Sequence, residues 1–210
     1  MGLWTIAFLA ILVTAYAIQF GISNIRDSGA VQEDSFIVFS GDRHMWIIVH
    51  AFSGSLALLV GWMQFIRRWR RGSLRMHRMI GMLYTLGIAV GGLTGLYLAL
   101  FATGGLASSL GFGLLSLGWL VTTGIGVYAI VVRKSPIEHS KWMLRSYALA
   151  FAAVTLRIYL PAAVISFGED NFITSYKIIA WLCWVPNLFF AEWLIRRKAY
   201  RNNNTPSFRA

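Results

Sequence analysis

Two of the four histidines, His77 and His139, each lie beside arginine or lysine residues at the start of an apolar stretch. An imidazole can bind haem iron, and a b-type haem can take two of them, one on each face. Arg78 and Arg145 lie close enough along the chain to pair with the haem propionates. The pattern therefore favours a haem b held by His77 and His139. The alternative is that both histidines contact lipid phosphate or loop carbonyls at the membrane surface.

A second set of polar residues lies within the apolar stretches: His50, Gln64 and Arg157. Arg157 is about eight residues from the end of its stretch, which is about 12 Å along a helix. An arginine near the middle of a bilayer costs about 2.5–3.5 kcal/mol, so it should face other helices and find a partner. That partner is either structural or a ligand. In the second case the three residues would line an outward-open cavity for a quinone or a small anionic or amphipathic ligand.

Small residues share a face with His50 if the surrounding stretch is helical. Taking 100° per residue, the face within about 40° of one line through His50 holds a short series: Gly54, Ala57, Gly61 and Gln64. The stretch after His77 has a similar glycine face, made by Gly81, Gly91 and Gly95. Such faces let another helix or a flat ligand approach closely, and helix packing is the commoner cause.

Other catalytic or metal chemistry has little support in the sequence. Neither a Gly-x-Ser-x-Gly nucleophile motif nor a His-Glu-x-x-His metal motif is present. A zinc site is disfavoured because no cysteine or carboxylate cluster joins the histidines, and the single Cys183 lies alone in an apolar stretch. These observations favour neither an enzyme nor a non-enzyme.

The residues named above lie in a chain with the composition of a membrane protein. Of its 210 residues, 57% are hydrophobic and 13% are charged, and the mean hydropathy is +0.62. Soluble domains carry about a quarter charged residues, and about 20 apolar residues form a helix that crosses a bilayer. The sequence predicts an all-α integral membrane bundle of six transmembrane helices, forming one domain over 1–201. The expected helices are 3–22, 46–66, 79–101, 109–132, 142–165 and 173–195, with a disordered tail over 202–210.

Charge sets the expected orientation of these helices. Fifteen of the 19 lysines and arginines fall at one side of the bundle, within 67–78, 133–145 and 196–209. Because positive charge favours the cytoplasmic side, both termini are expected in the cytoplasm, in a multi-pass protein of the bacterial inner membrane. The same distribution explains the net charge of +11 by topology and by contact with anionic lipids rather than by nucleic-acid binding.

The first expected helix contains Ala15-Tyr16-Ala17, which has the pattern of a signal-peptidase site. The residues before the helix lack the basic segment with which a signal peptide begins. We therefore expect this helix to be retained, and its cleavage is the alternative.

Several runs of these residues resemble a bacterial family of multi-pass membrane proteins that is defined as a domain of unknown function. The runs are His50-x-x-x-Gly54, Gly61-x-x-Gln64-Phe65, His77-Arg78-x-x-Gly81-x-x-Tyr84, His139-x-x-Trp142-Met143-x-Arg145-Ser146-Tyr147-Ala148-Leu149 and Ala153-Val154-Thr155-Leu156-Arg157. The resemblance covers roughly 45–165 and departs at Ser140-Lys141, where His-Arg is expected. It implies a membrane location and no particular activity, and it points to the candidate site residues: His50, Gln64, His77, Arg78, His139, Arg145 and Arg157.

The histidines at two levels also resemble, more loosely, transmembrane b-type cytochromes and ferric reductases. The expected helix 109–132 has neither His nor Met to face His50, which disfavours a second haem. Three functions stay open: a b-type haem redox protein, a non-haem protein that binds or transports a small ligand, and a structural or assembly subunit of a membrane complex or homo-oligomer. The haem hypothesis leads narrowly.

Overall fold

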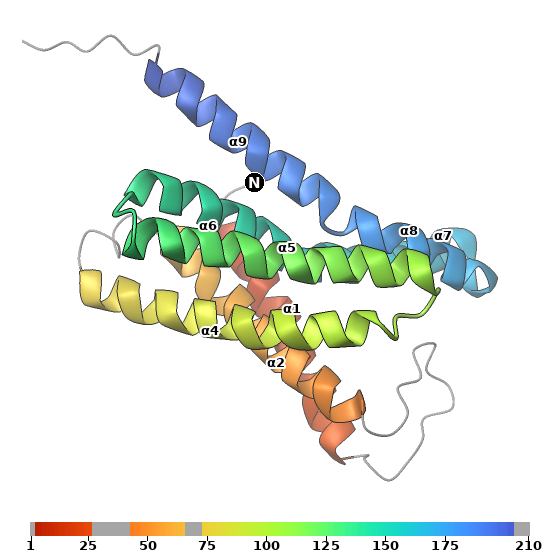
Figure 1. Cartoon of the computed structure of the whole chain (residues 1–210). Helices are drawn as coiled ribbons and strands as arrows, with labels where there is room; N and C mark the ends of the chain where they lie inside the picture. The colour runs from red at the N-terminus through yellow and green to blue at the C-terminus, as the bar shows by residue number, and fades with distance from the viewer. Residues whose placement is uncertain (1–2, 27–42, 66–72, 204–210) are drawn as a thin grey trace, which may run out of the picture.

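The computed structural model describes residues 3–26, 43–65 and 73–203. These residues are helical with short turns and contain no strand, which confirms the predicted all-α fold. The elements in chain order are α1 Leu3–Arg26, α2 Arg43–Gly61, η1 Trp62–Phe65, α4 Leu74–Ala99, α5 Leu106–Val131, α6 Pro136–Ala150, α7 Ala152–Phe167, η2 Glu169–Asn171, α8 Phe172–Leu182 and α9 Val185–Asn203 (Figure 1).

Five of these segments are long and apolar enough to cross a membrane. They are Arg43–Phe65, Leu74–Ala99, Leu106–Val131, Pro136–Phe167 and Glu169–Ala199. The first helix, α1, has 24 residues, and its apolar part within the described side chains is the shorter Ala7–Tyr16. Every one of the six segments expected from the sequence overlaps one of these helices, so the chain is a multi-pass membrane protein.

The helices α4 and α6 begin several residues before the apolar stretches from which they were predicted. The side chain of Ser73 accepts a hydrogen bond from the backbone N–H of Met76 and caps α4. Ser135 caps α6 in the same way through the N–H of Glu138, and Pro136 occupies the first turn. These caps start each helix within the basic segments, because a cap depends on side-chain donors and acceptors rather than on hydropathy. At the other terminus, residues 202 and 203 belong to α9, and the rest of the expected tail lies outside the described residues.

The last two membrane segments are each broken, where unbroken helices were expected. The first break separates α6 from α7 at Phe151, and the second separates α8 from α9 just before Pro186. A proline has no N–H for the carbonyl four residues earlier, so Pro186 interrupts the helix. The two breaks are joined, because Thr155 of α7 donates to the carbonyl of Cys183 and Asn187 donates to the same carbonyl at 2.9 Å.

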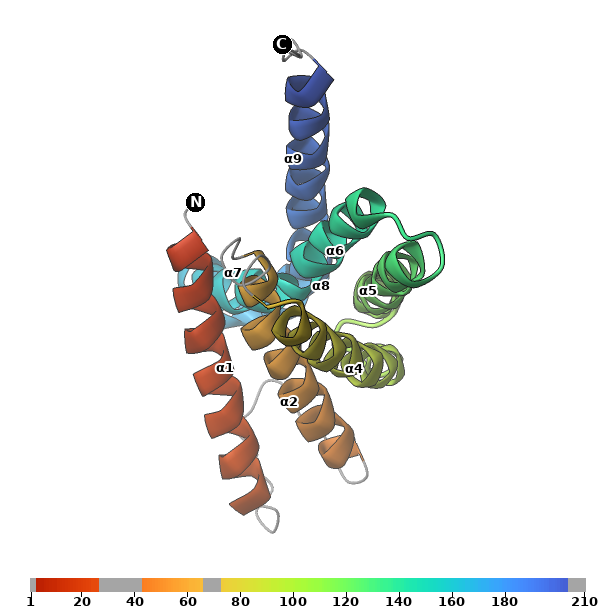
Figure 2. The ribbon, with the colours of Figure 1, turned by 90° about the vertical axis from the view of Figure 1, so that its left-hand side faces the viewer.

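The helices form a layered bundle in which α4 and α5 lie side by side and antiparallel, with α6 along the far side of α5 (Figure 1). The helix α2 packs on the other side of α4, and α1 packs on α2 (Figure 2). The turn between α4 and α5 uses Gly104 and Gly105, whose φ angles of 93° and 69° favour glycine. The C-terminal part of α9 leaves the bundle (Figures 1 and 2). We call the end at which α4 and α6 begin the basic end, and the other the far end.

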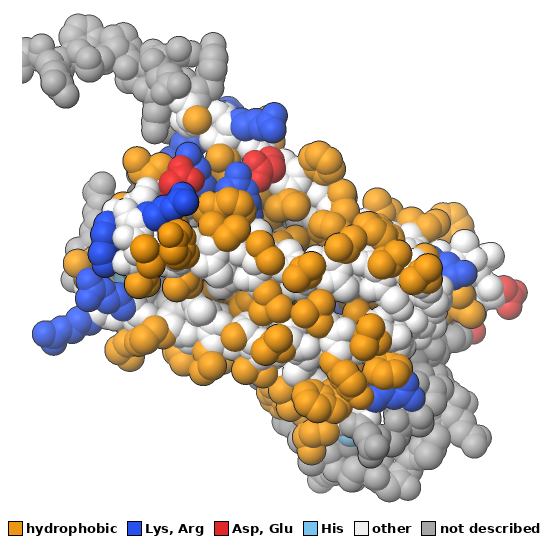
Figure 3. Space-filling model, in the orientation of Figure 1, with side chains coloured by type: hydrophobic (Ala, Val, Ile, Leu, Met, Phe, Trp, Pro, Cys, Tyr) orange, Lys and Arg blue, Asp and Glu red, His pale blue; other side chains and the backbone are white. Residues whose placement is uncertain are grey.

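The outside of the bundle is apolar over most of its length, as a lipid-facing surface requires. Figure 3 shows hydrophobic side chains over α4, α5 and α9, and basic side chains gathered towards the basic end. Inside, the largest side chains that are fully buried include Tyr84, Leu58, Ile88 and Val154. The core is thus built between α1, α2, α4, α5, α6 and α7.

A close approach of the backbones of α2 and α4 yields a prediction about stability. A Cβ on Gly87 would lie 3.0 Å from the carbonyl oxygen of Ser53, whereas a Cβ on Gly124 of α5 would have no atom within 4 Å. Gly87→Leu should therefore push α2 and α4 apart and destabilise the bundle by about 1–3 kcal/mol. Thermal unfolding in detergent, followed by circular dichroism, measures the effect. Gly124→Leu is the matched control, and an equal loss in both variants would contradict the close contact.

Candidate functional site

His50 lies in the half of the bundle nearer the far end, with its ring against α4. Its Nδ1 is 2.8 Å from the carbonyl oxygen of Gly91 and 3.4 Å from Oγ1 of Thr94. A Cβ on Gly95 would lie 3.0 Å from Cε1 of His50, so the absence of a side chain at Gly95 makes room for the ring. The glycine face expected on this helix therefore receives the His50 imidazole as well as the backbone of α2.

The hydrogen bond to Gly91 decides which nitrogen of His50 carries a proton. A carbonyl oxygen only accepts, so Nδ1 is the donor. No residue of the described segments makes a hydrogen bond to Nε2. In the neutral ring Nε2 is therefore an acceptor without a partner within the described residues.

Arg157 of α7 lies close enough for its charge to act on His50. Its NH1 donates to the carbonyl of Ala153 at 2.9 Å, and its guanidinium carbon is 5.5 Å from the centre of the Tyr16 ring on α1. Its Nε is buried and has no hydrogen-bond partner in the part of the chain that the structure describes. A guanidinium has five N–H donors, so most of those on Arg157 are unused by the described residues.

No carboxylate neutralises Arg157 among residues 3–26, 43–65 and 73–203, where the ion pairs are Lys141–Glu138 and Arg145–Glu192. The cation–π contact with Tyr16 offsets part of the cost of burying the charge. The arrangement can therefore bind a group that accepts hydrogen bonds and carries negative charge.

The small residues expected to share a face with His50 divide into two parts. A Cβ on Gly54, one turn along α2 from His50, would meet no atom within 4 Å. A Cβ on Gly61 would lie 2.6 Å from the ring of Tyr147, and Ala57 is fully buried. Helix packing thus explains the part of the face near Gly61, whereas open space remains beside His50.

Gln64 lies apart from His50 and Arg157. It belongs to η1, 14 residues beyond His50 along the chain, which is about 21 Å at the rise of a helix. Its Nε2 donates to the carbonyl of His77 at 3.1 Å, at the basic end. The structure therefore places His50 and Arg157 in the half of the bundle nearer the far end and Gln64 at the other level.

His77 and His139 lie at one level near the basic end, as the sequence predicted. A buried contact at 2.8 Å joins the hydroxyls of Tyr84 on α4 and Ser146 on α6. Each histidine lies seven residues before its member of this pair, which is two helical turns, or about 10 Å, nearer the basic end. Nδ1 of His139 is 2.8 Å from the carbonyl of Gly126 on α5, so Nδ1 carries the proton and Nε2 is the ring atom available to a metal.

The two arginines expected around a haem differ in their surroundings. Arg145 forms a two-point ion pair with Glu192 of α9, in which NH2 and Oε2 are 3.1 Å apart, and it lies 4.4 Å from the centre of the Trp142 ring. The partner of Glu192 is thus Arg145, 47 residues earlier in the chain and on another helix. Arg78 is exposed at the basic end. Arg145 is thus already engaged by a carboxylate, and Arg78 is not buried.

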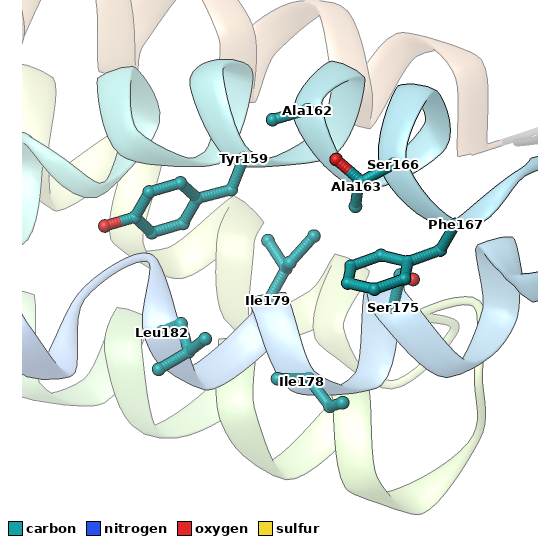
Figure 4. A pocket seen from close by; sticks show the side chains of 9 residues that line it. All are labelled: Tyr159, Ala162, Ala163, Ser166, Phe167, Ser175, Ile178, Ile179 and Leu182. Atoms are coloured by element: carbon teal, nitrogen blue, oxygen red, sulfur yellow. The ribbon is translucent and has the colours of Figure 1, made fainter.

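An apolar groove of about 280 Å³ lies between α7 and α8 (Figure 4). Its walls include Tyr159, Ala163, Phe167, Ile178, Ile179 and Leu182. Tyr159 is two residues from Arg157 and so points about 200° away around α7. The groove therefore opens on the opposite face of the helix from the polar site, and its lining suits a hydrocarbon chain.

Residues 47–195 match the DUF2306 family of predicted membrane proteins, and the matched region is most of the chain. The chain belongs to the DUF2306 family. The matched region contains His50, His77, His139 and Arg157. It extends beyond 45–165, over which the sequence resembles the family, and includes α8 and much of α9. Comparisons with curated proteins and with solved structures find no match.

Some residues of the two sites were not singled out from the sequence. Tyr16 precedes the DUF2306 region, and the sequence pointed to it only as part of Ala15-Tyr16-Ala17, which has the pattern of a signal-peptidase site. Thr123, whose hydroxyl is 2.7 Å from Ser146, gave no signal because threonine is common in membrane helices. Tyr84 and Ser146 lay within the family-like runs, but their contact across two helices was not expected.

The pair between Arg145 and Glu192 predicts unequal effects of two similar substitutions. Glu192→Gln should leave a half-buried guanidinium without its counter-ion and destabilise the packing of α9 on α6 by about 1–2 kcal/mol. Glu138→Gln is the matched control, because Glu138 pairs with Lys141 one turn away on the same exposed helix end. Its effect should stay below about 0.5 kcal/mol. Thermal unfolding in detergent compares them, and equal midpoints would show that the α6–α9 pair contributes no special stability.

Proposed function

We propose that this protein binds a small amphipathic ligand with an acidic headgroup inside the membrane, through Arg157 and His50. The observation that carries the proposal is the guanidinium of Arg157, which is half-buried with its Nε fully buried, lacks a carboxylate and uses one of its donors within the described residues. A cation in that setting is expensive, and membrane proteins keep such residues mainly where they serve a site.

The chemistry of the two side chains supports an acid as the ligand. A carboxylate or phosphate accepts two hydrogen bonds from one guanidinium and neutralises its charge. The imidazole of His50 adds a second polar contact through Nε2, which donates when protonated and accepts when neutral. The open space beside Gly54 leaves room near this pair. The apolar tail of the ligand would extend between the helices or into lipid.

The charge bias supports an orientation for this site. With the basic end in the cytoplasm of a bacterial inner membrane, the Arg157 and His50 site lies in the half nearer the external face. The ligand would therefore be taken from the outer leaflet or from outside the cell. Binding alone, or binding as a step of transport, fits this position.

Ligand-dependent thermal stabilisation of the purified protein tests the proposal. Laurate should raise the unfolding midpoint, decylubiquinone should raise it less because it accepts hydrogen bonds without charge, and dodecyltrimethylammonium should not raise it. Arg157→Gln should weaken laurate binding by about 1.5–3 kcal/mol, or roughly 10–150-fold. Tyr159→Phe is the control on the opposite face of the same helix and should bind laurate as the unchanged protein does.

Two results would overturn this assignment. One is equal stabilisation by the anionic and cationic amphiphiles, which would show that the tail alone is recognised. The other is an unchanged laurate shift in Arg157→Gln. His50→Gln should give an intermediate loss, since it removes the imidazole and keeps a polar side chain.

A second candidate function is electron transfer by a b-type haem at the basic end. It is favoured by His139, whose Nδ1–H bond to Gly126 would leave Nε2 as the nitrogen available to a haem iron. His77 at the same level would be the other ligand, and such a haem would supply one-electron chemistry. The fit is partial, because Arg145 is held by Glu192 and only Arg78 of the expected propionate partners is exposed. A quinone at Arg157 and His50 would then be the electron-exchange partner.

The visible spectrum of protein purified from haem-replete cells tests this second function. A Soret band that is lost in both His77→Ala and His139→Ala, and kept in His44→Ala, is the expected result. A folded protein without a Soret band would reject haem binding and leave the Arg157 site unaffected.

A further inference from the structure

The basic end carries a group of cations on the α5–α6 turn, on α6 and on α9. The ion pair between Arg145 of α6 and Glu192 of α9 joins two of the elements that supply these cations, and Lys141 pairs with Glu138 beside the turn. We call this set the basic surface: Arg133, Lys134, Lys141, Arg145, Arg196, Arg197 and Lys198.

The basic surface has an excess of positive charge that its own carboxylates do not neutralise. It contains seven cations and two acids, Glu138 and Glu192, and the ion pairs in the described segments engage Lys141 and Arg145. Arg133, Arg196 and Arg197 are exposed. Figure 3 shows basic side chains over α6 and the start of the free part of α9. The surface therefore has exposed cations available to an anion.

Three of the arginines also lie over aromatic rings. Arg133 is 5.4 Å from the centre of the Tyr128 ring, and Arg197 is 5.2 Å from that of Trp193. The third is Arg145 over Trp142, at 4.4 Å. Tyrosine and tryptophan concentrate where membrane helices meet the headgroup region. A ring of this kind can contact the upper acyl region of a lipid while the guanidinium beside it contacts the headgroup.

We propose that the basic surface binds the headgroup of an anionic phospholipid from the leaflet at this end. Charge complementarity supports an anion, since anionic headgroups attract clusters of Lys and Arg beside membrane helices. The aromatic rings support a lipid over a soluble partner, because they provide contact for the glycerol and upper acyl region in the same place. This lipid site is distinct from the Arg157 site, which lies in the other half of the bundle, and does not depend on it.

Native mass spectrometry of the detergent-purified chain with an equimolar mixture of phosphatidylglycerol and phosphatidylcholine tests the proposal. The unchanged protein should retain phosphatidylglycerol preferentially. The variant Arg133→Gln/Arg196→Gln/Arg197→Gln should reduce this preference about tenfold or more. The matched control is Arg43→Gln/Lys177→Gln, which removes two cations from the far end and should keep the preference.

Two outcomes would overturn the lipid site. In one, the triple variant retains phosphatidylglycerol as well as the unchanged protein does. In the other, the far-end control loses the preference to the same extent, which would indicate a response to net charge alone. A helical circular dichroism spectrum checks the folding of each variant. The single variant Arg197→Gln, beyond the α6–α9 ion pair, should give a partial loss if the triple variant does not fold.

Discussion

The close contact between α2 and the glycine face of α4 is the constraint on which the rest of the bundle depends. Gly87 brings the backbone of α4 against the carbonyl of Ser53, and Gly95 leaves the space that the His50 ring occupies. In lipid, where helix association gains little from the hydrophobic effect, such backbone proximity supplies much of the packing energy. A side chain at Gly87 would separate the helices, and one at Gly95 would displace the His50 ring. The position of His50 therefore depends on the bare face of α4.

A chain of buried hydroxyls performs a similar role between α4, α5 and α6. Ser146 contacts Tyr84 at 2.8 Å and Thr123 at 2.7 Å, so one hydroxyl of α6 joins both neighbouring helices. Interhelical hydrogen bonds of this kind contribute about 0.6 kcal/mol each on average, so they do not dominate stability. Their effect is to fix the level of α6 relative to α4. That level is what places His77 and His139 at the same height near the basic end.

The sequence predicted well where the helices lie and which residues share a helical face. It predicted poorly which residues of different helices contact one another. Each of the six segments located by hydropathy overlaps a helix, and five of the helical segments are long and apolar enough to cross a membrane. Gln64 shows the limit, because a helical wheel reports direction around the axis and says nothing of distance along it. Gln64 shares the direction of His50 and lies about 21 Å away. Glu192 shows the other limit: its ion-pair partner, Arg145, is 47 residues away, beyond the three or four residues that local helical spacing can relate.

The breaks in the last two membrane segments lie where α7, which carries Arg157, contacts the start of α9, which carries part of the basic surface. Pro186 leaves the carbonyl of Leu182 without its usual donor, which is costly in a membrane unless neighbouring groups compensate. Around the same turn, Thr155 and Asn187 both donate to the next carbonyl, that of Cys183, so side chains hold the bend in place. Because Thr155 also precedes Arg157 by two residues on α7, the bend that directs α9 outward is fixed to the helix that carries the buried cation. The direction of α9, and with it the position of the part of the basic surface on α9, is thus set by the bend before Pro186. Without the donors at Thr155 and Asn187, backbone carbonyls at this bend would lack hydrogen bonds inside the membrane.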